Sequence, residues 1–215
     1  MISFENVTAT YSKDVGIFNL SFHIPSGEMV FIMGPTGAGK STVLRAIYND
    51  IQISNGKIIV DGEDITKLKQ RQIPYYRRKI GMIFQDFKLL PDRTLFENVA
   101  LPLRILGTPK KIIVQKVRDT LDKVGLVDKW KELPNQLSGG EQQRVSIARA
   151  LVKDPIIILA DEPTGNLDLN ISDEILDIME MVTKSGTSVL MCTHNFPLVR
   201  PRKKNFLELS KGRLL

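Results

Sequence analysis

Hydrophobic residues follow two different rhythms along this chain. In residues 2–7 and 20–24 they alternate with polar residues, and this period of two predicts an antiparallel β unit. Further along, short apolar runs are almost unbroken, and they occur at 29–33, 80–84, 156–160 and 189–192. Such runs are typical of buried strands, and the aliphatic run 156–160 fits a strand of a parallel sheet that is covered on both faces. Because helix-like segments separate these runs, the sequence predicts an α/β fold.

Between residues 86 and 137 the pattern changes to a helical one. Apolar residues recur every three or four positions there, and the breaks are marked by Gly107, Pro109, Gly125 and Pro134. No strand-like pattern interrupts this stretch, which predicts a helical insert. We therefore interpret the 215 residues as a single domain, in which residues 1–85 and 141–215 form the core and residues 86–140 a helical subdomain.

Residues 34–41 have the full pattern of a phosphate-binding loop. The stretch reads Gly-Pro-Thr-Gly-Ala-Gly-Lys-Ser, directly after the apolar run 29–33 and directly before residues 42–49, which we predict to be helical. Glycines let backbone N–H groups approach a phosphate cluster, and the positive end of the helix adds to the attraction. Lys40 is predicted to bridge the terminal phosphates and the Ser41 hydroxyl to hold Mg²⁺. An ordinary glycine-rich turn is the alternative, and the full spacing in this context makes it the weaker one.

Polar side chains follow three other predicted strands. Gln85 follows one, Asp161 and Glu162 follow the second, and His194 follows the third. In open α/β sheets ligands bind at the carboxyl ends of the strands. A structural role is the default for a lone histidine, but together with Lys40 these residues place polar groups at four strand ends, which favours one shared site.

Asp161 and Glu162 are the candidates for metal and acid–base chemistry. Two adjacent carboxylates at the end of a buried strand are costly without a cation or another partner. Asp161 is therefore the candidate ligand of the Mg²⁺ on Ser41, and Glu162 the candidate base that orients and deprotonates a water molecule.

Ser138 precedes two glycines at the start of a predicted helix, and this is a second arrangement that suits an anion. Two further features have open alternatives. Tyr11 lies in a predicted loop, where its ring could stack on adenine or simply cover the end of a strand. The basic segment 67–79 is expected to be a solvated helical face, with nucleic acid or lipid headgroups as possible but unsupported partners.

Composition bears on the binding partners and the cellular compartment of the chain. A net charge of +6 favours anionic partners without choosing among nucleotide, nucleic acid and membrane surface. The apolar run at 155–160 is far shorter than the roughly 20 residues that span a bilayer, so the chain is not expected to cross a membrane by itself. Its start lacks the pattern of a secretion signal, and one cysteine, Cys192, fits a reducing cytoplasm.

These motifs occur in the order found in ATP-binding cassette (ABC) ATPases, and the chain resembles that family along nearly its whole length. The resemblance is carried by the loop 34–41, Gln85, Leu-Ser-Gly-Gly-Glu at 137–141, the strand 157–162, Asn-Leu-Asp at 166–168 and His194. Within the family, residues 136–145 and 160–168 are similar to the group of lipoprotein-release, macrolide-efflux and cell-division subunits. Residues 80–94 look most like the cell-division subunits.

The resemblance implies a P-loop NTPase (RecA-like) core with an antiparallel β subdomain and an inserted helical subdomain, which binds ATP and Mg²⁺ and hydrolyses ATP. The catalytic residues that it implies are Glu162, His194, Gln85 and Lys40. The implied nucleotide-binding residues are Tyr11, Gly34, Pro35, Thr36, Gly37, Ala38, Gly39, Lys40, Ser41, Thr42, Ser138, Gly139, Gly140, Glu141 and Asp168. The implied metal ligands are Ser41, Gln85 and Asp161.

The resemblance also implies partners. Two copies are expected to close head to tail as an ATP-sandwich homodimer, with each ATP between residues 34–42 of one copy and 138–140 of the other. An FtsX-like integral membrane protein is expected to dock near Gln85 to Arg93 and to hold the chain, as a peripheral protein, at the cytoplasmic face of the bacterial inner membrane. ATP-driven closure would then signal to cell-wall hydrolases across that membrane.

Two alternatives remain at this point. One is an ATPase subunit of a lipoprotein-release or macrolide-type exporter. The other is a soluble ABC protein that acts on ribosomes or DNA, which usually needs tandem cassettes or a long coiled-coil insertion; the sequence has neither, and no nucleic-acid partner is expected.

Overall fold

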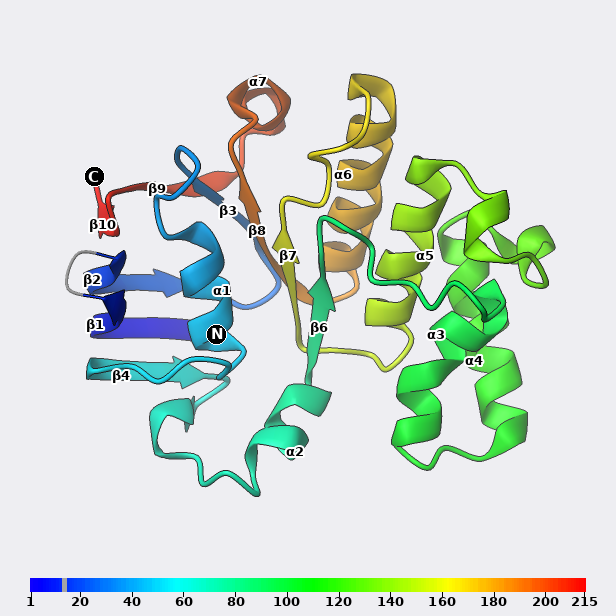
Figure 1. Cartoon of the computed structure of the whole chain (residues 1–215), viewed down its shortest axis with the longest axis horizontal. Coiled ribbons are helices and arrows are strands. Elements are labelled where there is room, and N and C mark those ends of the chain that lie inside the picture. Colours follow the sequence, from blue (N-terminus) through cyan, green and yellow to red (C-terminus); the bar gives the residue numbers. More distant parts are fainter. Residues whose placement is uncertain (13–14) are drawn as a thin grey trace.

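The strands form two sheets, with helix α1 (Lys40–Ile47) between them (Figure 1). This computed structural model describes residues 1–12 and 15–215. The first sheet is antiparallel and has the strand order β2-β1-β4-β5. Its strands are β1 (Ile2–Ser12), β2 (Val15–Ile24), β4 (Asn55–Val60) and β5 (Glu63–Asp64). The antiparallel unit predicted from the alternating pattern is therefore confirmed.

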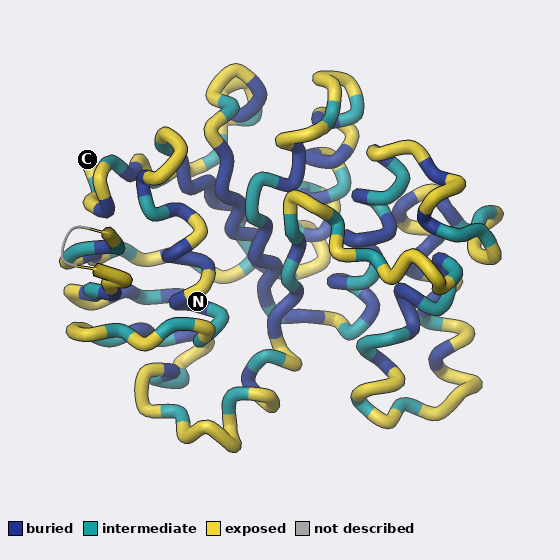
Figure 2. The backbone as a smooth tube through the Cα atoms, in the orientation of Figure 1, coloured by how far each residue is buried: buried dark blue, intermediate teal, exposed yellow. Residues whose placement is uncertain are grey.

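The second sheet has the strand order β10-β9-β3-β8-β7-β6 and is parallel except for β10. Its strands are β3 (Met29–Met33), β6 (Ile80–Ile83), β7 (Ile157–Asp161), β8 (Ser188–Thr193), β9 (Asn205–Ser210) and β10 (Arg213–Leu214). Every residue of β3 and β8 is buried, as the unbroken apolar runs predict (Figure 2). Because the strands are parallel, the residues that follow β3, β6, β7 and β8 meet at one edge of the sheet.

Helices cover this sheet and extend from one side of it (Figure 1). The α-helices are α2 (Ile73–Arg78), α3 (Leu95–Ile105), α4 (Lys110–Lys123), α5 (Gly139–Leu151), α6 (Leu169–Lys184) and α7 (Phe196–Val199). Short 3-10 helices occupy Ile65–Lys67, Val127–Lys129, Pro134–Gln136 and Arg200–Arg202. Apolar residues of α3, α4, α5 and α6 join one face of the parallel sheet in a single core cluster.

The stretch from residue 86 to residue 140 contains α3, α4, two of the 3-10 helices and the start of α5, and no strand is described within it. α3 and α4 pack against each other and against α5, at the far end of the molecule from the antiparallel sheet (Figure 1). The fold class is thus confirmed, while the division into residues 1–85, 86–140 and 141–215 stays a prediction.

Two local predictions need correction. Tyr11 lies in strand β1 and not in a loop, because β1 continues its pairing with β2 as far as Ser12. The basic segment 67–79 is α-helical only from Ile73 to Arg78, where Pro74 occupies the second position of α2. Within the described ranges, no helix combines the length and the apolar character that crossing a bilayer requires.

Candidate functional site

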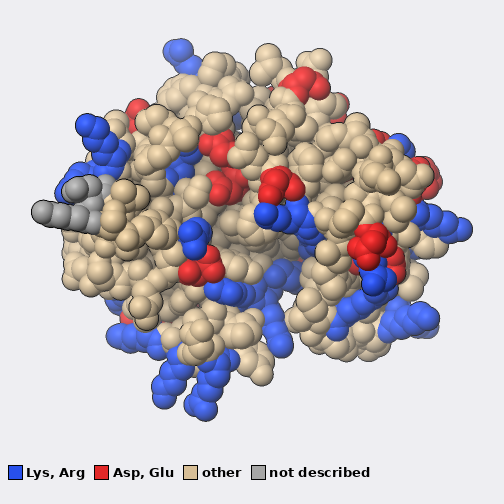
Figure 3. Space-filling model, in the orientation of Figure 1, with Lys and Arg blue, Asp and Glu red and all other residues tan. Residues whose placement is uncertain are grey.

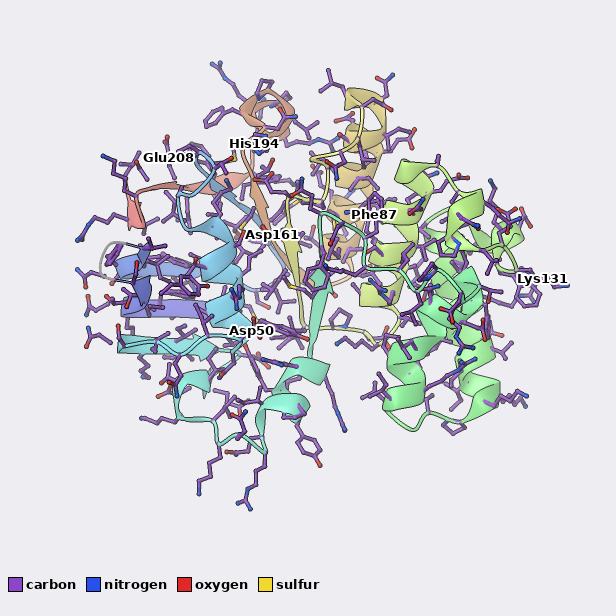
Figure 4. All side chains as sticks on the ribbon, viewed as in Figure 1. Asp50, Phe87, Lys131, Asp161, His194 and Glu208 are labelled. Carbon is purple, nitrogen blue, oxygen red and sulfur yellow. The ribbon has the colours of Figure 1, made fainter. Side chains whose placement is uncertain are left out.

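A cavity of about 500 Å³ opens at the carboxyl edge of the parallel sheet, where Figure 4 places Asp161 and His194. The loop before α1 and the ends of β6, β7 and β8 border it. The lining residues are Val15, Gly16, Thr36, Gly37, Ala38, Gly39, Lys40, Ser41, Thr42, Gln85, Asp161, Glu162 and His194. The structure thus brings together the polar groups predicted at four strand ends.

The loop that leads into α1 depends on glycine. Gly34 and Gly39 have φ values of 148° and 103°, which side chains rarely allow. A Cβ atom on Gly34 would lie 2.2 Å from the carbonyl oxygen of Leu209. Gly39 is the N-cap of α1 and offers no side-chain cap, and the first turn of α1 contains no acidic residue. The positive N-terminal end of α1 therefore faces the cavity without a counter-charge from its own first turn.

Lys40 is almost completely buried, with 7% of its side chain exposed, and its ammonium group is held by three acceptors. Nζ donates to the carbonyl oxygens of Gly34 (2.8 Å) and Pro35 (3.2 Å) and lies 3.2 Å from Oε1 of Glu162. A buried ammonium group in an anion-binding loop can form charge-assisted hydrogen bonds with phosphate oxygens.

Ser41 and Asp161 form a pair in the same cavity. The Ser41 hydroxyl donates to Oδ1 of Asp161 over 3.0 Å. Burial raises the pKa of Asp161 above its ordinary value, an effect that the Ser41 hydrogen bond opposes and the neighbouring charge of Glu162 reinforces. A hydroxyl, a carboxylate and the nearby Gln85 amide are hard oxygen donors of the kind that Mg²⁺ prefers, so these residues fit that ion.

Glu162 links Lys40 to His194. Its φ of 47° lies in the left-handed region, and its N–H donates to the Cys192 carbonyl oxygen over 3.0 Å. The chain turns away from β7 here, and the carboxylate reaches Lys40 through Oε1 and Nδ1 of His194 through Oε2, at 3.2 and 3.0 Å. Strained backbone of this kind is found at functional sites. A carboxylate held between two cationic or proton-sharing groups can accept a proton from a positioned water molecule.

Gln85 lies in the turn after β6, next to a strained bend. Its Nε2 atom would be 2.9 Å from a Cβ atom on Gly165, so that glycine leaves room for the amide. Phe87 and Lys88 have φ values of 57° and 51°. Their carbonyl oxygens accept hydrogen bonds from the guanidinium group of Arg149 on α5, over 2.6 and 2.5 Å. The cavity lining and the α5 helix are therefore connected through this bend, a link that the sequence analysis did not predict.

The second glycine-rich helix start lies outside the cavity. Ser138 is the N-cap of α5 and forms a capping box with Glu141. Hydrogen bonds from Lys129 first, and then from the Ser138 N–H, lower the pKa of Glu141 to about 2. A Cβ atom on Gly140 would lie 2.5 Å from the Ile171 side chain, so this glycine is required for the close packing of α5 on α6.

Some of the predicted binding residues do not line the cavity. Ser138, Gly139, Gly140 and Glu141 stand at the start of α5, and Asp168 caps α6 by accepting a hydrogen bond from the Ile171 N–H over 3.0 Å. The carbonyl oxygens of Gly34 and Pro35 accept hydrogen bonds from the ammonium group of Lys40. The hydroxyl of Tyr11 accepts a hydrogen bond from Arg45 (3.1 Å), whose guanidinium group also lies over the ring.

Three residues near the site were missed. Val15 and Gly16 line the cavity from the start of β2, a position that follows from strand pairing and that no motif marks. Gln143 on α5 is fully buried, and its Nε2 atom donates to the Pro163 carbonyl oxygen over 2.7 Å, one residue after Glu162. Its sequence signal was weak, since a glutamine in an exposed-looking helical turn gives no sign of burial.

Comparisons with known proteins show what this chain is similar to. The family model described as ABC transporter matches residues 17–165. The chain is 51% identical to the cell division ATP-binding protein FtsE of Escherichia coli, over 100% of this chain and 97% of that protein. It is 45% identical to FtsE of Bacillus subtilis, over 99% and 93%. A dimeric ATP-binding cassette in a post-hydrolysis state, bound to ADP and Pi, superposes with a TM-score of 0.88 at 35% identity, covering 100% of this chain and 96% of that one.

Proposed function

Because this chain belongs to the ABC transporter family and is an ATPase, we propose that it uses ATP hydrolysis to drive an FtsX-like integral membrane partner in bacterial cell division. The cell-division role is supported by identities of 40–51% to proteins named FtsE over nearly the full chain. The observation that carries the chemistry is the convergence of Lys40, the Ser41–Asp161 pair and the Glu162–His194 pair in one cavity.

Each of these groups has a proposed role. The backbone N–H groups of residues 36–42 and the ammonium group of Lys40 bind the phosphates. Ser41 and Asp161, with Gln85, hold Mg²⁺, and that ion when bound supplies positive charge against the phosphate oxygens. Glu162 accepts the proton of the attacking water, and His194, 3.0 Å from Oε2, orients the carboxylate and holds it in place.

A second copy of the chain completes the site in this proposal. The start of α5 with Ser138 to Gly140 lies outside the cavity, so one chain brings only the phosphate loop and the catalytic groups to a bound nucleotide. A head-to-tail homodimer places the α5 start of each copy over the cavity of the other. A relative of known structure is itself a dimer that holds ADP and Pi. Turnover then depends on dimerisation.

The partner is proposed to dock near Gln85 to Arg93. A groove of about 300 Å³ lies there between β6 and α3, and its lining is mostly apolar. The residues that line it are Tyr48, Ile80, Met82, Phe84, Lys88, Leu101, Pro102, Arg149, Ala150 and Lys153. Arg149 binds the bend at Phe87 and Lys88, so an occupant of the groove would act on the segment that carries Gln85. Docking would hold the chain at the cytoplasmic face of the inner membrane.

The substitution Glu162→Gln tests the catalytic assignment. The amide keeps the size of the side chain but cannot accept the proton, so ATP binding remains and hydrolysis falls roughly 10²- to 10⁴-fold. The variant is also expected to elute as a dimer with MgATP in size-exclusion chromatography. Glu208→Gln, an exposed glutamate on β9, is the matched control and keeps the activity of the unmodified chain. Full hydrolysis by Glu162→Gln would remove Glu162 from its role.

The membrane role has a separate test. The chain is purified from bacterial membranes in mild detergent with an affinity tag, and the proteins bound to it are identified. An integral membrane protein of FtsX type is the expected partner. An exporter subunit with a large extracytoplasmic domain in its place would contradict the cell-division role and leave the ATPase assignment unaffected.

A further inference from the structure

Two segments of this chain contain many cations and no carboxylates. Residues 65–79 include six Lys or Arg and no Asp or Glu, and residues 98–118 include five Lys or Arg and no Asp or Glu. The first segment contains α2 and the loop before it, and the second contains the α3–α4 hairpin. The chain has 24 acidic residues, so their absence from two stretches rich in Lys and Arg concentrates positive charge there. Such a concentration of charge favours the binding of an anionic partner.

Both segments project from the same edge of the molecule. In Figure 1 the α2 region and the α3–α4 turn are the two lowest points of the ribbon, while the parallel strands run upward toward their carboxyl ends. Figure 3 shows Lys and Arg side chains projecting along this lower edge with few carboxylates beside them. The edge is opposite the cavity that holds Asp161 and His194, so a ligand of one does not obstruct the other.

The outermost cations at this edge have no carboxylate partner among the described residues. They are Lys69, Arg71 and Arg78 near α2, and Arg104, Lys110 and Lys111 at the hairpin, and all six are exposed. Their neighbours Lys67, Lys79 and Lys116 are paired, with Asp64, Glu63 and Asp154 respectively. We call these six residues the basic edge. Their charges are available to an external anion.

Large apolar side chains accompany these cations. Tyr75 is 64% exposed on α2, with Arg78 over its ring, and Ile105 and Ile112 are 68% and 47% exposed at the hairpin. A hollow of about 290 Å³ at the same hairpin is lined by the apolar side chains of Phe96, Ile113 and Val114 together with Arg104, Thr108 and Lys110. Cations beside exposed aliphatic and aromatic groups are typical of surfaces that lie against lipid headgroups. Nucleic acid would use the charges and leave the isoleucines in water.

We propose that the basic edge binds the surface of a membrane that contains anionic lipids, with Tyr75, Ile105 and Ile112 entering the headgroup layer. This proposal rests on the proposed function, because docking on a membrane partner determines which side of the chain faces the bilayer. The two protrusions flank the docking groove for the partner, so contact with lipid at both would set the orientation of the groove toward the membrane. Each cation near such a surface strengthens binding about fivefold.

Vesicle sedimentation with the purified full chain tests the proposal. We expect binding to vesicles of phosphatidylglycerol and phosphatidylcholine, no binding to phosphatidylcholine alone, and release by high salt. The triple variant Arg104→Gln, Lys110→Gln, Lys111→Gln is expected to weaken binding on the order of a hundredfold. The control variant Lys131→Gln, Lys203→Gln, Lys211→Gln removes the same charge from exposed positions elsewhere and is expected to bind nearly as well. Equal losses in the two variants would overturn the proposal.

Two further measurements test whether the isoleucines enter the interface and whether the ligand is lipid or nucleic acid. The double variant Ile105→Ser, Ile112→Ser is expected to weaken vesicle binding severalfold with all charges intact, and unchanged binding would exclude entry of these side chains into the interface. Duplex DNA that displaces the vesicles at equal phosphate concentration would overturn the choice of lipid. Absent vesicle binding in a chain that still hydrolyses ATP and captures its partner would overturn this inference alone. Normal vesicle binding in a chain without ATPase activity would contradict the proposed function alone.

Discussion

Two helix starts in this molecule look alike in sequence and differ in structure. α1 follows Gly39, whereas α5 begins with Gly139 and Gly140 after its N-cap Ser138, and both helix starts present backbone N–H groups that suit an anion. At α1 no side chain of the described residues caps the helix, and no acidic residue lies in its first turn. At α5 Ser138 and Glu141 form a capping box, in which the carboxylate of Glu141 accepts a hydrogen bond from the Ser138 N–H over 2.9 Å. One site is open and the other carries its own anion.

In the proposed dimer, this difference gives the two helix starts different roles. The α1 start is surrounded by a cavity with Lys40 in it, so it can hold a phosphate group by itself. None of the cavities described above is lined by the α5 start, and Lys129, the cation that reaches it, is paired with Glu141. In the proposed dimer the α5 start therefore closes over a nucleotide that the other copy holds, and it contributes weak contacts that matter only after closure.

Replacing Lys40 gives the largest expected effect because it removes a buried cation from the start of α1. Lys40→Ala is expected to weaken MgATP binding at least a hundredfold, through the loss of charge-assisted hydrogen bonds to phosphate. Isothermal titration calorimetry measures this directly. Lys184→Ala, at an exposed position in the last turn of α6, is the control. Unchanged affinity of Lys40→Ala would contradict the assignment of residues 34–41.

The site at the start of α1 could be predicted from the sequence better than the site at the start of α5, for a physical reason. The residues that line the cavity lie in short motifs at strand ends, and parallel strands bring their carboxyl ends together whatever the rest of the chain does. Lys40, Asp161 and His194 could therefore be placed from the sequence. Tyr11 could not, because the length of β1 depends on its pairing with β2.

The contacts that the sequence did not reveal are long-range ones between ordinary residues. Arg149 on α5 binds two carbonyl oxygens at the bend after Gln85, and Gln143 on α5 binds the Pro163 carbonyl oxygen next to Glu162. Neither residue stands in a motif that implies its partner, and the partners lie 20 or more positions away. Periodicity gives the face of a helix, but it does not tell which loop that face meets.

Mixing two inactive variants tests whether the two helix starts work in trans. Ser138→Arg places a bulky cation at the start of α5. This variant is expected to have no ATPase activity by itself, and the same is expected of Lys40→Ala. In a mixed dimer one site combines an intact loop from the Ser138→Arg chain with an intact α5 start from the Lys40→Ala chain. ATPase activity is therefore expected to return to a fraction of that of the unmodified chain. No recovery at any mixing ratio would argue against pairing between copies.

Glu141→Gln gives the smallest expected effect and bears most directly on the difference between the helix starts. The amide can keep the capping box but loses the ion pair with Lys129 and the charge at the helix N-terminus. We expect the free energy of unfolding to fall by about 1 kcal/mol at pH 7. The folded chain lowers the pKa of Glu141 to about 2 from 4.5. The stabilisation is therefore complete above pH 4.5 and is lost as the pH falls toward 2.

The same substitution is expected to strengthen ATP-dependent dimerisation up to about fivefold, because a negative charge near the incoming phosphates is removed. Sedimentation equilibrium in the Glu162→Gln background measures it. Glu97→Gln is the matched control: Glu97 forms the same capping box, with Thr94 at the start of α3, away from both glycine-rich starts. It should lower stability similarly and leave dimerisation unchanged. If both variants tighten the dimer equally, or if Glu141→Gln loosens it, the carboxylate at α5 does not oppose the nucleotide, and the two helix starts differ only in their caps.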